Sequence, residues 1–169
     1  SNLNVVGLNT TNAIAGHLWN GANNNTFTNC SFSVPLSATV LNSSAFSISS
    51  SAINPNSASN PTGFGGKNNT LQSCTASGGY YCVIIDGSSS NTDSNNQVIN
   101  CMINDFERIG LTSDYNFNLL ARGNTFERLN RTSLGNAFVG MLISVGCAGS
   151  TIEKNIFRNP FANDTTNCR

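Results

Sequence analysis

Apolar and polar positions in this chain follow a short unit that recurs along the sequence. Its clearest copy is residues 95–103, Asn-Asn-Gln-Val-Ile-Asn-Cys-Met-Ile, and residues 24–32 and 68–76 are close relatives. In each copy an apolar residue is followed three positions later by cysteine and five positions later by another non-polar residue. In a regular strand, side chains on the same face are two residues apart. Here the cysteine comes three residues after the apolar residue, so the inward-facing set shifts by one residue. One bend residue between two short strands explains the slip.

The bend falls on a small polar residue, and asparagine tolerates the left-handed backbone region better than most residues. The cysteine that follows each bend is then predicted to point inward. If the copies stack, these positions form two ladders: Asn29, Ser73 and Asn100 at the corner, and Cys30, Cys74 and Cys101 beside it. Looser copies place Val6, Asn124 and Asn155 at the cysteine position.

Further strands are predicted between the copies, at residues 13–19, 80–85 and 137–144, where apolar runs are bounded by turn residues. Cys30 and Cys74 are 44 residues apart, whereas Cys74 and Cys101 are 27 apart. Either two repeats or one repeat with a long insertion would explain the larger spacing. We favour a loop excursion near residues 42–67, which is rich in Ser, Asn, Pro and Gly, although residues 38–41 and 45–48 have some preference for β-structure.

A spacing of roughly 20 to 31 residues, with three short strands and no helical pattern, is typical of a β-solenoid. On its N-x-[hydrophobic]-x-[Asn/Ser]-Cys-x-[Phe/Ala/Ile] unit, the chain resembles the right-handed parallel β-helix proteins of the pectate-lyase-like superfamily and their secreted relatives. The resemblance implies an all-β, right-handed parallel β-helix (a solenoid) of about five to six turns. We expect residues 1–169 to be a single β-helix domain, and a fragment or repeat module of a longer extracellular protein. A β-sandwich is the alternative fold, but its strands would not repeat one unit.

Composition favours an extracellular, turn-rich protein. Only 9% of the residues are charged, against about a quarter in a typical protein, and 29 asparagines, 22 serines and 15 threonines supply most of the polar groups. Eight basic and eight acidic residues cancel, which argues against a nucleic-acid partner, and no apolar run is long enough for membrane insertion. Glycosylation sequons begin at Asn9, Asn24, Asn29, Asn42, Asn68, Asn130 and Asn163.

Cysteine and histidine are expected to be structural. The three ladder cysteines read as buried thiols rather than bridges, while Cys147 and Cys168 lie outside the ladder and could pair. His17 is the one histidine, and a structural role is favoured over a catalytic one. Trp19 and Tyr80 could be sugar-stacking platforms, but their strand-like surroundings favour the core.

No catalytic motif of the β-helix enzymes can be placed residue by residue. The resemblance implies one of two chemistries for an enzyme of this architecture: Asp-bound calcium with an Arg or Lys base to cleave acidic polysaccharides, or paired carboxylates to hydrolyse glycosides. Charged residues recur at like places in successive repeats, and they form either a carbohydrate cleft or a ladder of opposite charges. If the chain is an enzyme, the catalytic candidates are Asp105, Glu107, Arg108, Arg122, Glu127 and Arg128. Asp86 and Asp93 are the weak calcium candidates.

The sequence therefore predicts a structural or adhesive module, secreted or displayed on a cell surface, with no cofactor. Its expected partners are surface glycans or itself, since the open ends of a β-helix can pair strand to strand. End-to-end stacking would build a filament or surface fibre. The alternative is a carbohydrate-active enzyme, a polysaccharide lyase or a glycoside hydrolase (depolymerase).

Overall fold

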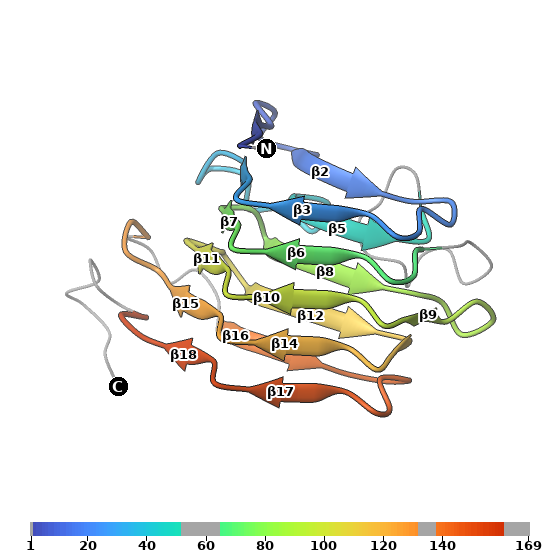
Figure 1. Ribbon diagram of the computed structural model, residues 1–169. Helices are drawn as coiled ribbons and strands as arrows, with labels where there is room; N and C mark the ends of the chain where they lie inside the picture. The colour runs from blue at the N-terminus through green and yellow to red at the C-terminus, as the bar shows by residue number, and fades with distance from the viewer. Residues whose placement is uncertain (1, 52–64, 132–137, 161–169) are drawn as a thin grey trace.

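The computed structural model describes residues 2–51, 65–131 and 138–160, and within these ranges every regular element is a β-strand. Short strands stack in sequence order from the N-terminal to the C-terminal end (Figure 1). Each strand pairs in parallel with its equivalents one repeat earlier and one repeat later. This is the arrangement of a β-solenoid, and it is incompatible with a sandwich of antiparallel sheets.

Three parallel sheets form the walls of the coil, and the chain visits them in a fixed order. Sheet A is β1 (Asn4–Val6), β4 (Ser31–Ser33), β7 (Thr75–Ser77), β11 (Met102–Asn104), β15 (Thr125–Glu127) and β18 (Ile156–Phe157). Sheet B is β2 (Ile14–Leu18), β5 (Ser44–Ser49), β8 (Tyr81–Asp86), β12 (Ile109–Asp114) and β16 (Val139–Ile143). Sheet C is β3 (Thr26–Thr28), β6 (Thr70–Gln72), β10 (Gln97–Ile99), β14 (Leu120–Arg122) and β17 (Thr151–Glu153). A fourth, two-stranded sheet pairs β9 (Asp93–Ser94) with β13 (Asn116–Phe117).

The corner between sheets C and A is a single left-handed residue, as the slip in the pattern predicts. Asn29, Ser73 and Asn100 have φ of 54°, 51° and 52°, and Gly123 and Lys154 occupy the same corner in the later repeats. The backbone N–H of each corner residue donates to the adjacent repeat, for example Asn100 to the Arg122 carbonyl at 2.8 Å. One residue therefore turns the chain without breaking the ladder between repeats.

The cysteine ladder is confirmed, and asparagine continues it. The backbone N–H of Cys30 donates to Cys74 Sγ at 3.3 Å, and Cys101 Sγ donates to the Leu71 carbonyl at 3.3 Å. Further along, Asn124 Oδ1 accepts from the N–H of Cys101 at 2.9 Å, and Asn155 Oδ1 accepts from the N–H of Asn124 at 2.9 Å. A thiol and an amide thus satisfy the same backbone groups at one repeat position.

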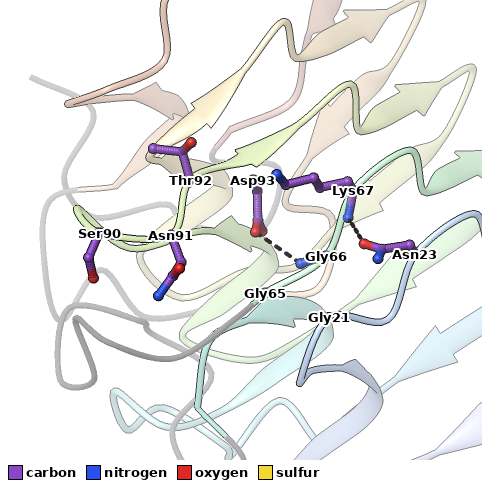
Figure 2. A pocket seen from close by; sticks show the side chains of 9 residues that line it. All are labelled: Gly21, Asn23, Gly65, Gly66, Lys67, Ser90, Asn91, Thr92 and Asp93. Atoms are coloured by element: carbon purple, nitrogen blue, oxygen red, sulfur yellow. Dashed lines mark hydrogen bonds between the residues drawn. The ribbon is translucent and has the colours of Figure 1, made fainter.

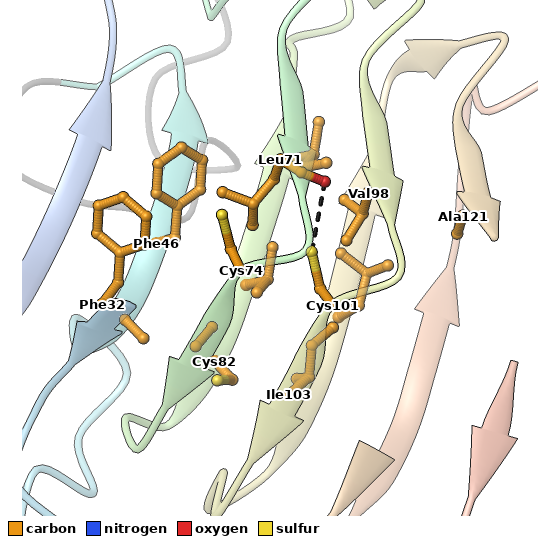
Figure 3. Close-up of a cluster of buried hydrophobic side chains, with 14 of the residues drawn as sticks. Phe32, Phe46, Leu71, Cys74, Cys82, Val98, Cys101, Ile103 and Ala121 are labelled. Atoms are coloured by element: carbon orange, nitrogen blue, oxygen red, sulfur yellow. Dashed lines mark hydrogen bonds between the residues drawn. The ribbon is translucent and has the colours of Figure 1, made fainter. Parts of the chain in front are cut away.

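The core lies between the three sheets and is built from stacked side chains. Figure 3 shows Cys74 between the phenylalanine pair, Phe32 and Phe46, and Cys101, with Leu71 near Cys74 and Val98 near Cys101. The inward ladder of sheet C is Phe27, Leu71, Val98, Ala121 and Ile152. The inward ladder of sheet A is Val5, Phe32, Ala76, Ile103, Phe126 and Phe157. Burial of each large side chain contributes about 1.5–3 kcal/mol, so packing between sheets dominates the stability.

Two predictions about the N-terminal half need correction. Strand β3 pairs directly with β6, so one repeat with an insertion does separate Cys30 from Cys74. The excursion is narrower than residues 42–67, however, because residues 44–49 form β5, a fully buried strand of sheet B. In the first repeat, Val5 pairs with Phe32, which places Leu3 rather than Val6 opposite Cys30.

Candidate functional site

A polar cleft lies at the corner where the chain passes from sheet B to sheet C. Its volume is about 370 Å³, and the segments that precede β3, β6 and β10 form its walls. Figure 2 shows these segments side by side, with the lysine and aspartate side chains between them. The lining residues are Gly21, Asn23, Gly65, Gly66, Lys67, Ser90, Asn91, Thr92 and Asp93.

Hydrogen bonds between neighbouring repeats preform the walls of the cleft. The N–H of Gly21 donates to the Gly65 carbonyl at 2.8 Å, and the N–H of Lys67 donates to Asn23 Oδ1 at 2.7 Å. Glycine at position 65 leaves room for the Asp93 carboxylate, since a Cβ there would clash with it unless the carboxylate moved. No aromatic or aliphatic side chain is among the described lining residues, so the cleft suits a polar molecule rather than an apolar one.

Asp93 lies beneath this cleft and is only 2% exposed. Its Oδ1 accepts from the N–H of Gly66 at 2.9 Å, while Oδ2 has no hydrogen-bond partner among the described residues. Burial raises the pKa of Asp93 to about 7, against the weaker opposing effects of the Gly66 N–H and the Lys67 ammonium. Near neutral pH this carboxyl is therefore divided between its protonated and ionised forms.

Neither calcium candidate belongs to a cluster of metal-binding side chains within the described residues. Asp86 is 1% exposed at the end of β8, and its Oδ1 accepts from the N–H of Asp114 at 3.0 Å. Across the described part of the chain, no three His, Cys, Asp or Glu side chains gather closely enough to hold a metal ion. Since calcium needs several oxygen ligands, the geometry of Asp86 and Asp93 gives calcium little support.

Two of the catalytic candidates, Asp105 and Glu107, belong to a buried network around Arg131. The Arg131 guanidinium pairs with Glu107 at 3.1 Å and donates to the Asp105 carbonyl at 2.7 Å and to the Leu36 carbonyl. The Asp105 carboxylate accepts two hydrogen bonds from Asn130 at 2.8 Å. These contacts tie together the loops that leave β4, β11 and β15 of sheet A.

The other candidates are also engaged in the fold. Glu127 pairs with Arg158 at 2.9 Å, and Arg122 pairs with Glu153 across neighbouring strands of sheet C. Arg128 is 1% exposed, and its guanidinium lies 4.4 Å from the centre of the Phe138 ring. Arg108 is half-buried, and its backbone carbonyl accepts from the N–H of Val139. The six candidates are thus distributed over several ion pairs and contacts rather than gathered around one cleft.

His17 forms a contact that the sequence did not reveal. Its Nε2 lies 2.8 Å from Ser49 Oγ, and burial lowers the pKa of the imidazole. A serine beside a neutral histidine is the pairing that nucleophilic enzymes use. Ser49 is completely buried, however, and its hydroxyl donates to the Ser51 carbonyl. The pair therefore fits a structural link between β2 and β5.

The remaining predicted residues are placed as follows. Cys74, Cys82 and Cys101 are buried thiols; burial raises the pKa of Cys82, and the neighbouring Cys74 raises the pKa of Cys101. Cys147 is partly exposed, whereas Cys168 and Asn163 lie outside the described residues.

Trp19 is 48% exposed, so its assignment to the core was wrong, and Tyr80 is half-buried. Among the sequons, Asn9, Asn24, Asn29, Asn68 and Asn130 are exposed, and Asn42 is half-buried.

Both ends of the coil expose apolar side chains. At the N-terminal end the outermost strands are β1, β2 and β3, and at the C-terminal end they are β16, β17 and β18. No further strand covers them among the described residues. The C-terminal end also has a cavity of about 280 Å³, lined by four phenylalanines and by Glu127, Arg128, Gly140, Arg158 and Pro160. Exposed apolar residues at or near the two ends include Leu3, Val6, Leu8 and Trp19, and Val139, Leu142, Val145, Ile152, Ile156 and Phe157.

Sequence reasoning missed the Asp93 cleft because its walls come from three separate repeats. The doubled asparagines at 24–25, 68–69 and 95–96 were a usable signal. The first residue of each pair has positive φ and forms a second corner, and the second residue is an internal amide ladder. Stacking these pairs would have brought the segments just before them together.

Comparison with family models finds no match to this chain, and comparisons with curated proteins and with solved structures find none either. Within the described ranges there is no helix long and apolar enough to span a membrane. The function is therefore inferred from the geometry of the coil.

Proposed function

We propose that the chain is a structural and adhesive module built as a right-handed parallel β-helix of about five to six turns, and that its copies join end to end into a filament or surface fibre. The observation that carries this proposal is the pair of open, apolar ends. Unpaired strand edges are templates for pairing with another chain. A contact between unlike ends repeats indefinitely, which is how head-to-tail filaments form.

The order of strands supports a head-to-tail contact. Each end offers one outermost strand from each sheet, so β16, β17 and β18 of one copy can meet β2, β3 and β1 of the next. If the internal register continued across the contact, Phe157 would lie beside Val5 of the second copy and Ile152 beside Phe27. The same apolar ladders that form the core would then run through the junction.

The distribution of charge supports the same contact. No Asp, Glu, Lys or Arg occurs before Lys67, so the strands of the N-terminal end carry no fixed charge. A second copy can approach this end without repulsion between like charges or the cost of burying an unpaired charge. The low charge and the abundance of Asn, Ser and Thr also support an extracellular location, with surface glycans as a further class of partner.

Assembly is tested by sedimentation velocity and negative-stain imaging across a range of concentrations. The N-terminal variant Val6→Lys and the C-terminal variant Ile156→Lys each place a charge on an edge strand at a side chain that is 53% exposed. We expect the wild type to form concentration-dependent linear oligomers and each variant alone to stay monomeric. Because each variant keeps one intact end, an equimolar mixture should form dimers and stop there.

Phe117→Lys is the matched control, since Phe117 is 48% exposed but lies on β13, along the side of the coil. This variant should assemble like the wild type, and circular dichroism should be the same for all four proteins. A wild type that remains monomeric at the highest concentration would overturn end-to-end joining. A mixture that assembles beyond dimers would overturn the head-to-tail geometry.

A further inference from the structure

The polar cleft above Asp93 has the features of a small-molecule site. Its volume of about 370 Å³ lies within the usual range for ligand pockets, and would hold a molecule of about ten non-hydrogen atoms. The carboxyl beneath it is 2% exposed and has one oxygen without a hydrogen-bond partner among the described residues. An unsatisfied polar group buried at the base of a polar cleft needs an explanation beyond packing.

The charge that the cleft presents to solvent is positive. Lys67 is exposed and forms no ion pair within the described residues. Near it, the side-chain N–H groups of Asn23 and the hydroxyl of Thr92 donate no hydrogen bond to any of the described residues. An ammonium with neighbouring hydrogen-bond donors is suited to an oxyanion. A single cation above a buried acid favours a monoanion over a doubly charged phosphate.

We propose that this cleft binds a small hydroxylated monocarboxylate, with its carboxylate on Lys67 and its hydroxyl groups towards Asn23 and Thr92. The buried Asp93 makes this binding dependent on pH. Apart from Lys67, it is the one ionisable side chain among the described lining residues. Protonated Asp93 leaves the charge of Lys67 unopposed, whereas ionised Asp93 repels the ligand carboxylate, so affinity should fall as the pH rises through neutrality.

Isothermal titration calorimetry with quinate as the probe tests the proposal, with uncharged methyl quinate as the matched control. Quinate is ionised at both pH 6 and pH 8, so a change in affinity between them reports on the protein. We expect quinate to bind at pH 6 at least about tenfold more tightly than methyl quinate, and to bind more weakly at pH 8. Lys67→Gln should abolish the preference for quinate.

Asp93→Asn separates the binding of the carboxylate from its dependence on pH, because it removes the titrating group and keeps a side chain of similar size. This variant should still bind quinate, with the same affinity at pH 6 and pH 8. Equal binding of quinate and methyl quinate, no heat of binding for either at millimolar concentrations, or unchanged quinate binding in Lys67→Gln would each overturn the proposal. Thermal unfolding of both variants checks that a lost signal does not reflect a lost fold.

Discussion

Left-handed single residues set the two corners on either side of each sheet C strand. The first corner is Asn24, Asn68, Asn95, Asn118 and Gly149, and the second is Asn29, Ser73, Asn100, Gly123 and Lys154. A non-glycine residue costs about 1–2 kcal/mol in this backbone region. At the first corner, the side-chain amides offset part of this cost by bonding from repeat to repeat at 3.1–3.2 Å. This ladder explains why asparagine is so abundant in a chain with few charges.

Asn124 tests whether the ladder position matters for its hydrogen bonds or only for its size. Asn124→Ala would leave the N–H of Cys101 and the Val98 carbonyl without their side-chain partner in the core. We expect it to lower the free energy of unfolding by about 1–3 kcal/mol, measured by chemical denaturation. Asn124→Cys, which copies the residue at 74 and 101, should lose less. Equal losses in the two variants would show that the hydrogen bonds are unimportant.

Asp93 predicts a pH dependence of stability. Its pKa is raised from 3.8 to about 7 by burial, so the folded protein holds an extra proton between these two pH values. The stability that depends on this proton is complete below about pH 4 and is lost as the pH rises to about 7. Asp93→Asn should therefore change the free energy of unfolding little at pH 4 and raise it at pH 8, by at most about 4 kcal/mol. A gain that does not grow with pH would contradict this assignment.

At the scale of elements, small residues of sheet B accommodate the aromatic side chains of sheet A. A Cβ added at Gly110 of β12 would lie 2.5 Å from the Gly140 carbonyl and 2.8 Å from the Phe126 ring. Gly110→Ala should therefore lower stability by about 1–3 kcal/mol, measured as a shift in the denaturation midpoint. Gly21→Asn is the control, because a Cβ at Gly21 meets nothing within 4 Å and asparagine tolerates its φ of 74°. A similar loss in both variants would mean that crowding is not the cause.

Arg131 links the loops that connect sheet A to sheet B. Arg131→Met removes its bonds to Asp105, Glu107 and Leu36 and leaves Glu107 as a buried charge without its arginine partner. We expect a loss of about 3–5 kcal/mol in the free energy of unfolding. Adding Glu107→Gln should recover part of that loss, because it removes the uncompensated charge. If the double variant is less stable than the single one, the ion pair is not the dominant interaction.

Elements were predictable from the sequence where the repeated unit was strong. The slip between inward positions located both the corner and the cysteine ladder, because a single left-handed residue moves the inward-facing set by one position. The first repeat was less clear, since adjacent Val5 and Val6 allow either residue to point inward. Residues 45–48 favoured a strand, but the predicted excursion still included β5 because its alternating serines resemble a loop, although they are buried in the structure. The cleft was missed, since its walls are distant in sequence and only the doubled asparagines indicate that they stack.

At the scale of the whole molecule, stacking of repeats produces both the ends and the cleft. Parallel pairing aligns equivalent segments, so one polar insertion per repeat becomes a continuous wall beside Asp93. The same pairing leaves β1 and β18 as the outer strands of sheet A. Charged residues are unevenly distributed along this axis. The first one in the chain is Lys67, just before β6, the second strand of sheet C. The proposed assembly through the ends and the proposed binding in the side cleft can therefore be tested separately.

The most direct test of the coil is the pattern of backbone proton contacts between strands, measured by nuclear Overhauser effects on the isotope-labelled protein. The parallel coil predicts in-register contacts between neighbouring residues of the sheet C ladder Phe27, Leu71, Val98, Ala121 and Ile152. Antiparallel contacts, or no contact between the strands that contain Leu71 and Val98, would contradict the coil and with it the ends and the cleft.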